Sequence, residues 1–289
     1  MKVPLSPVIC RSLRSIFALV VAASSVAPHA FAASSLWVQG HKTQARLVSG
    51  QTGAEQGATR FAFVEIELQP GWKTYWRTPG DAGGLPPSFD WSKSSNLASA
   101  DVRYPAPQRF TDKSGNTIGY DGGLVLPVVL TPESAEKPIS LVAELHYGIC
   151  KDICIPVELE LALDIPAKPA EAASQEALEA LASVPRAQDQ LKPGDPVLLR
   201  AQSELTGAVP KITVEARFPQ GAEGADAFLE APDGLFLPLP EKVGDPKGGQ
   251  VTFEAALGPD VDLEALKGKP ITVTLVGETG SSFATFPAQ

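Results

Sequence analysis

Two cysteines, Cys150 and Cys154, are the residues of this sequence whose type and spacing most clearly allow chemistry. A disulfide needs Cα atoms about 4.4–6.8 Å apart, whereas an extended chain would separate these two by about 13 Å. The chain must therefore turn between them. We expect a helical turn, between a strand that ends near Tyr147 and one that begins at Val157. A pair on such a turn can be reached by a partner thiol, which suits thiol–disulfide exchange.

The residues alone leave two other roles open for the pair. A purely structural bond would close a very short loop, worth about 2 kcal/mol, and a chain of this length has enough core to fold without it. A metal site is the second alternative, because His146, Cys150 and Cys154 recur every four residues and would share one face of a helix. Such ligands suit Cu(I) or Zn(II), but a closed site needs a fourth. We therefore predict no metal and no cofactor.

The N-terminus predicts export. Three basic residues precede the apolar stretch 16–23, and an Ala-x-Ala site ends at Ala32. This order is typical of a secretory signal peptide over residues 1–32, and the apolar stretch is too short to span a bilayer. Cleavage would remove Cys10 and leave one cysteine pair in an oxidising periplasm. It would also lower the net charge of −9 by three units. An acidic chain without basic clusters argues against nucleic acid as a partner.

The rest of the chain is predicted to be all-β. Residues 157–163 alternate between apolar and acidic side chains, which is the period of a half-buried strand. Similar runs at 61–68, 124–130 and 140–145 are separated by Pro/Gly turns, and this predicts a sandwich or barrel over residues 33–166. An Ala/Glu/Leu-rich stretch predicts a linker with a short helix within 167–195. Further runs at 197–200, 211–218, 235–239, 251–257 and 271–276 predict a second, smaller β-sandwich over 196–289.

Aromatic residues gather upstream of the cysteines. Three of the four tryptophans lie between residues 72 and 91. Core packing is the usual role of tryptophan in a sandwich, and we expect it for Trp72 and Trp91. Successive side chains of a strand point to opposite faces, so only some of the residues around Tyr75 can point inward. A polar loop around Phe110 is either a plain connection or a lid over the disulfide.

Together these segments resemble the N-terminal periplasmic domain of the thiol:disulfide interchange protein DsbD, and more closely its ScsB (suppressor of copper sensitivity) type. The resemblance rests on PGWKTYWR at 70–77, DAGGLPP at 81–87, LVLP at 124–127 and residues 147–156, and it spans about residues 36–166. It implies an immunoglobulin-like domain that passes electrons from a membrane-embedded redox module to periplasmic client proteins. The cysteine spacing is shorter than in DsbD and matches ScsB-like sequences better.

The resemblance also implies roles for single residues. Cys154 matches the cysteine that forms the mixed disulfide with the client, and Cys150 the one that resolves it. Tyr75 and Tyr147 are expected to line the active site, and Phe110 to belong to a cap that shields the sulfurs. The membrane module of the full-length relatives does not follow in this sequence, so we expect a separate membrane-embedded thiol-redox protein as electron donor. The predicted function is a periplasmic protein-disulfide reductase component. A copper-binding protein and a non-catalytic adaptor are the alternatives.

Overall fold

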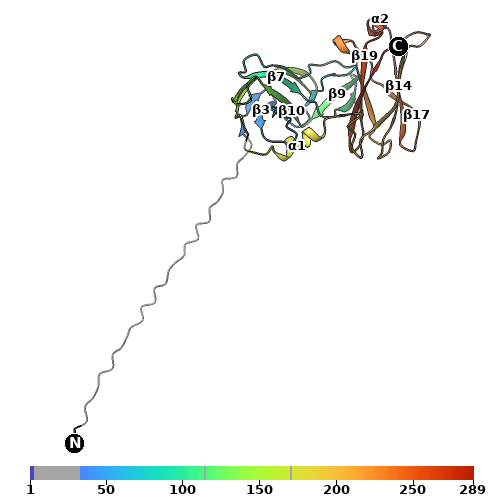
Figure 1. The fold of residues 1–289 in the computed structure, drawn as a ribbon. Coiled ribbons are helices and arrows are strands. Elements are labelled where there is room, and N and C mark those ends of the chain that lie inside the picture. The colour runs from blue at the N-terminus through green and yellow to red at the C-terminus, as the bar shows by residue number, and fades with distance from the viewer. Residues whose placement is uncertain (3–32, 114, 170) are drawn as a thin grey trace. The chain divides into compact units, whose positions relative to one another are not determined.

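The computed structural model describes residues 1–2, 33–113, 115–169 and 171–289. Apart from its first two residues, the predicted signal peptide lies outside the described residues. The described residues from 33 onward belong to one compact unit and consist mainly of β-strands (Figure 1). Among the described residues, no helix has the length and apolar character needed to cross a membrane.

Residues 33–165 form a sandwich of two antiparallel sheets. The first sheet has the order β1-β3-β4-β10-β7, with β2 paired to β3. Its strands are β1 (Ala33–Ser34), β2 (Val38–Gly40), β3 (Thr43–Ser49), β4 (Arg60–Leu68), β7 (Leu97–Val102) and β10 (Gly123–Pro132). The second sheet has the order β12-β11-β5-β9-β8, with β6 paired to β11. Its strands are β5 (Lys73–Tyr75), β6 (Ser88–Asp90), β8 (Gln108–Asp112), β9 (Gly115–Asp121), β11 (Ile139–Cys150) and β12 (Cys154–Ile165).

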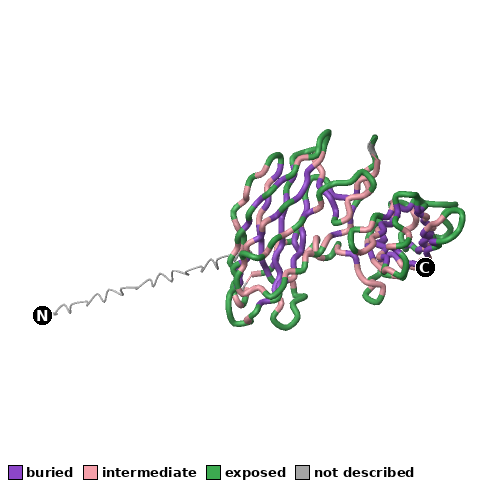
Figure 2. The backbone as a smooth tube through the Cα atoms, turned by 90° about the horizontal axis from the view of Figure 1, so that it is seen from above, coloured by how far each residue is buried: buried purple, intermediate pink, exposed green. Residues whose placement is uncertain are grey.

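Side-chain alternation places the core between these two sheets. In β12 the side chains of Val157, Leu159 and Leu161 are buried while Glu158 and Glu160 are exposed. Figure 2 shows the same alternation of buried and exposed positions along many strands. Because successive side chains of a strand point to opposite faces, the apolar half of each strand joins one cluster. The predicted all-β sandwich is confirmed.

The first sheet is also buried on its outer face, by helix α1 (Gln175–Ala182). Phe61 and Phe63 point away from the sandwich core and pack with Ala173 and Ala177 in a separate cluster. The helix begins at Ser174, whose hydroxyl accepts a hydrogen bond from the Ala177 backbone N–H at 3.1 Å, a standard N-cap. The predicted short helix is confirmed, and it closes one face of the first sandwich.

A second sandwich follows, as predicted. One sheet has the order β13-β20-β19-β16 and the other β14-β15-β18-β17. The strands are β13 (Arg186–Ala187), β14 (Val197–Glu204), β15 (Lys211–Arg217), β16 (Asp226–Glu230), β17 (Glu241–Lys247), β18 (Gln250–Ala256), β19 (Pro270–Val276) and β20 (Ser281–Pro287), with short helices η1 (Pro232–Gly234) and α2 (Leu263–Leu266) between them. The strand predicted at 235–239 is wrong. Pro238 and Pro240 have no N–H to donate to a ladder, although Leu237 and Leu239 are still buried there.

Candidate redox site

The two cysteines lie at the tip of the long hairpin formed by β11 and β12. Cys150 ends β11, Cys154 begins β12, and the two are direct partners in the strand register. A disulfide joins them, with Cα atoms 4.2 Å apart. The expected helical turn is wrong, because strand pairing continues up to both cysteines. Tyr147 and Ile149 extend the alternating buried face of β11, so only residues 151–153 are left for the turn.

The two cysteines differ in how exposed they are. Cys154 is exposed, whereas Cys150 is half-buried. Beside them on the turn, the Ile153 side chain is 65% exposed, and Leu85 on a nearby loop is 51% exposed. A partner protein can therefore reach Cys154 first.

Tyr75, from β5, lies beside the sulfur of Cys154. Its hydroxyl is 3.0 Å from Sγ of Cys154, although the residue as a whole is only 3% exposed. Two glycines make room for the ring. A Cβ at Gly148 would lie 3.0 Å from it, and a Cβ at Gly84 would lie 2.3 Å from it. Gly148 also donates its backbone N–H to the carbonyl of Leu85 at 2.8 Å. Tyr75 is thus confined in a slot that directs its hydroxyl to Cys154.

Burial favours the role of Tyr75 as a hydrogen-bond donor. Desolvation raises the pKa of Tyr75 above its usual value, so the hydroxyl keeps its proton at neutral pH. When the disulfide is reduced, the Tyr75 hydroxyl can donate to a thiolate at Cys154. A hydrogen bond to a charged acceptor contributes about 1.5–3 kcal/mol. This contact would stabilise the thiolate, which is the nucleophile in exchange.

Tyr147, the other tyrosine expected at the site, lies in the core. It is 2% exposed, and its hydroxyl is hydrogen-bonded to the Thr43 hydroxyl at 2.7 Å, which links the two sheets. Burial raises the pKa of Tyr147 to about 12, although the Thr43 hydrogen bond opposes the shift. Alternation along β11 puts Tyr147 and Cys150 on opposite faces. The structure does not bring Tyr147 to the sulfurs.

The two tyrosines offer a matched pair of hydroxyl deletions. We expect Tyr75→Phe to slow alkylation of reduced Cys154 at pH 7 about tenfold, because about 1.5 kcal/mol of thiolate stabilisation is lost. Its melting temperature should change little. Tyr147→Phe should instead lower the free energy of unfolding by about 1 kcal/mol and leave alkylation unchanged. Iodoacetamide kinetics and thermal unfolding measure both effects, and equal kinetics for the two variants would contradict the assignment.

The position of Phe110 relative to the cysteines follows from the order of the strands in the second sheet. Phe110 belongs to β8, and strands β5 and β9 lie between β8 and β11. Its ring contacts the ammonium group of Lys73, which is 4.3 Å from the ring centroid, and Lys73 is the register partner of Cys150. Phe110 therefore contacts Lys73, the residue that is paired with Cys150 in the sheet.

His146 does not join the cysteines in the way the metal alternative needs. That alternative assumed a helix, but His146 and Cys150 both lie in strand β11, where four residues span about 13 Å. His146 is exposed and pairs with Glu158 in the neighbouring strand. Among the described residues, no group of three or more His, Cys, Asp or Glu side chains is arranged to hold a metal ion.

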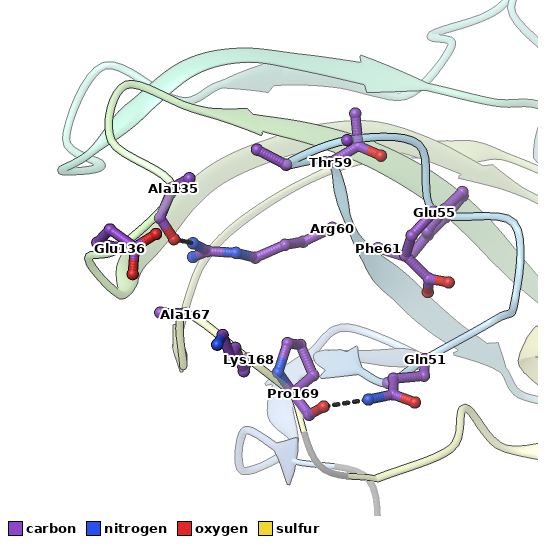
Figure 3. Close-up of a pocket in the computed structure, with 13 residues that line it drawn as sticks. Gln51, Glu55, Thr59, Arg60, Phe61, Ala135, Glu136, Ala167, Lys168 and Pro169 are labelled. Atoms are coloured by element: carbon purple, nitrogen blue, oxygen red, sulfur yellow. Dashed lines mark hydrogen bonds between the residues drawn. The ribbon is translucent and has the colours of Figure 1, made fainter.

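A cavity of about 570 Å³ lies at the beginning of β4 (Figure 3). Strand β5, which pairs with the cysteine-bearing β11, follows the other end of β4. The cavity is lined in part by Arg60, Glu136 and Lys168. Arg60 donates to the carbonyl oxygens of Ala135 at 2.8 Å and Lys137 at 2.9 Å, which secures the turn after β10. None of the predicted site residues lines this cavity.

The structure thus shows a β-sandwich domain with a disulfide at the tip of a hairpin. Residues 44–166 match the family described as "Thiol:disulfide interchange protein DsbD, N-terminal". This match confirms the resemblance predicted from the sequence.

A solved structure covers both sandwiches. The crystal structure of the N-terminal periplasmic domain of ScsB from Proteus mirabilis superimposes with a TM-score of 0.65, over 89% of this chain and 99% of that chain, at 20% sequence identity. At this identity the match shows the fold, and it confirms the predicted architecture. Comparison with curated protein sequences gave no match.

Proposed function

We propose that this protein is a periplasmic thiol–disulfide exchange protein that reduces client disulfides through Cys150 and Cys154. One observation carries the proposal. Cys154 is an exposed residue at a hairpin tip, its sulfur lies 3.0 Å from the Tyr75 hydroxyl, and Cys150 is bonded to it as an internal partner. The family of residues 44–166 supports the same class of chemistry.

The proposed reaction transfers two electrons. In the dithiol form, the Cys154 thiolate attacks a client disulfide, forms a mixed disulfide and releases one client sulfur as a thiol. The Cys150 thiolate then attacks Sγ of Cys154 and releases the second client thiol. The products are a reduced client and the Cys150–Cys154 disulfide seen in this structure. Tyr75 would act in the first step, by stabilising the attacking thiolate.

Regeneration of the dithiol needs a reductant, which we assign to a separate membrane-embedded thiol-redox protein. That partner would donate two electrons to the Cys150–Cys154 disulfide, and its thiolate would attack Sγ of Cys154. The predicted signal peptide supports a periplasmic location, as does the periplasmic origin of the ScsB domain. We propose no metal or organic cofactor, because the exchange needs only the two thiols.

The reduction potential of the pair tests this function. We expect the mature protein, equilibrated with glutathione buffers, to give a potential near or above about −250 mV, which is typical of exchanging disulfides. The fraction of oxidised pair can be counted by alkylation and mass spectrometry. A potential below about −300 mV would identify a structural bond and would favour the adaptor alternative.

A further inference from the structure

Edge strand β16 of the second sandwich presents three alternate side chains to the first sandwich. Because neighbours alternate across a strand, Asp226, Phe228 and Glu230 share one face. Phe228 is fully buried and lies in the core cluster of the first sandwich. Its ring centroid is 5.7 Å from that of Trp76. This apolar contact anchors β16 next to the segment that follows Tyr75.

Each acidic residue beside Phe228 makes a two-point ion pair with an arginine of the first sandwich. Nε and Nη2 of Arg77 each donate to the Glu230 carboxylate at 2.7 Å, and the Thr78 hydroxyl donates to the same carboxylate at 3.1 Å. Arg109 donates to Asp226 at 3.0 and 2.7 Å. Such bidentate pairs fix orientation as well as distance. Strand β16 therefore fixes two segments of the first sandwich.

The loop of residues 76–85 connects the Glu230 ion pair to the redox site. At its beginning, Arg77 follows Tyr75 by two residues. At its end, Gly84 packs against the Tyr75 ring, where a Cβ would come within 2.3 Å. The carbonyl of Leu85 then accepts the Gly148 N–H at 2.8 Å, two residues before Cys150. A displacement of this loop would therefore open one wall of the slot that holds Tyr75.

Close packing does not hold the middle of this loop against the second sandwich. A cavity of about 460 Å³ lies between them, lined on the loop side by Pro79, Gly80 and Gly83 and on the other side by residues of the 229–239 segment. The Arg77–Glu230 pair lies at this cavity, and the Leu239 N–H also reaches across to the Asp81 carboxylate at 3.3 Å. A segment beside a cavity lacks the dense contacts that fix an interior. On its other side, the loop is attached to β9 of the first sandwich, where the Ile118 N–H donates to the Pro79 carbonyl at 2.8 Å and the Ala82 N–H donates to the Asn116 carbonyl at 3.1 Å. On the side of the second sandwich, the polar contacts therefore hold the loop.

We propose that Glu230 is a positioning residue for the redox site. Its ion pair with Arg77 holds the 76–85 loop against the Tyr75 ring and so keeps the Tyr75 hydroxyl on Cys154. The inference rests on the proposed function, because it uses Tyr75 as the donor to the thiolate. It gives the second sandwich a part in the reaction, because the second sandwich would set the reactivity of a cysteine that belongs to the first.

The test measures the reactivity of Cys154 in the full mature chain. In a Cys150→Ala background, iodoacetamide alkylation of Cys154 is followed from pH 5 to pH 10 by mass spectrometry. Glu230→Gln should lower the rate at pH 7 by at least about twofold, the smallest coupling expected within one contact network, and shift the midpoint of the profile upward. Glu254→Gln is the matched control, because it breaks the 2.9 Å pair with Lys211 inside the second sandwich. It should change neither quantity.

A double variant tests whether the effect passes through Tyr75. In a Tyr75→Phe background, Glu230→Gln should have no further effect. The same decrease in both backgrounds, an unchanged rate, or a faster rate would each overturn the proposal. Arg77→Lys keeps the charge but loses the two-point geometry and should reproduce the decrease if Glu230→Gln unfolds. Alkylation needs no client protein, so a wild type that reduces no client would count against the proposed function alone.

Discussion

Replacing Cys150 by alanine will trap a mixed disulfide on Cys154, whereas replacing Cys154 by alanine will trap almost none. Cys154 is exposed and has the Tyr75 hydroxyl beside it, while Cys150 is half-buried. An attack by Cys154 cannot be resolved without the second thiol, so the adduct accumulates. We expect Cys150→Ala to react with glutathione disulfide at least about tenfold faster than Cys154→Ala, given the difference in exposure and in thiolate stabilisation. Mass spectrometry of the intact protein counts the adduct.

The variant that lacks both cysteines is the control for this trap. It should form no adduct and remain folded, because the bond closes a very short loop and contributes only about 2 kcal/mol in the chain-entropy view. Equal adducts on both single variants would contradict the assigned roles. Unfolding of the variant that lacks both, with no adduct on either single variant, would support the structural alternative for the disulfide.

The strands could be predicted where one face of a strand is polar. In β12 the acidic residues between Val157 and Leu163 made the alternation visible, and the strand extends as expected. The end of β11 was missed because Gly148 and Cys150, which share the outer face, are not charged. On the other face, Tyr147 and Ile149 are apolar and buried at alternate positions, and this alternation indicates that the strand continues to Cys150.

The alternation of side chains along a strand also distinguishes the two tyrosines that were predicted to line the site. Tyr147 and Cys150 differ by an odd number of residues, so a strand that runs through both must put them on opposite faces. The predicted helical turn between the cysteines did not carry this alternation as far as Cys150, and Tyr147 was expected on the same side as the sulfurs. Tyr75 could be placed only through the resemblance to the DsbD family, because its proximity to Cys154 depends on pairing between β5 and β11, which are more than 60 residues apart.

The contacts of β16 could not have been predicted from the sequence alone. Asp226, Phe228 and Glu230 alternate as in any half-buried strand, but the partners Arg77 and Arg109 come from distant segments of the first sandwich. No spacing rule connects them. The only local signal is a strand face that carries acids on both sides of a phenylalanine. Such a face is better suited to a polar contact surface than to the interior of a sandwich.

Gly84→Ala should disable the redox site without unfolding the protein. A Cβ at this position would lie 2.3–2.6 Å from three atoms of the Tyr75 ring, closer than any non-bonded contact allows. The ring must move, and its hydroxyl then leaves Sγ of Cys154. We expect the alkylation rate of reduced Cys154 at pH 7 to fall about tenfold or more, at least as far as in Tyr75→Phe, because the same hydrogen bond is lost. Iodoacetamide kinetics in the Cys150→Ala background measure it.

The neighbouring Gly83→Ala separates this contact from backbone strain. Gly83 has a φ of 70°, so alanine there costs about 1 kcal/mol or more, but a Cβ would meet nothing within 4 Å. Its melting temperature should therefore fall while the reactivity of Cys154 stays close to that of the wild type. If Gly83→Ala slowed alkylation as much as Gly84→Ala, loop strain and not the Tyr75 contact would control the thiolate. If neither variant did, the Tyr75 hydroxyl would have no part in activating Cys154.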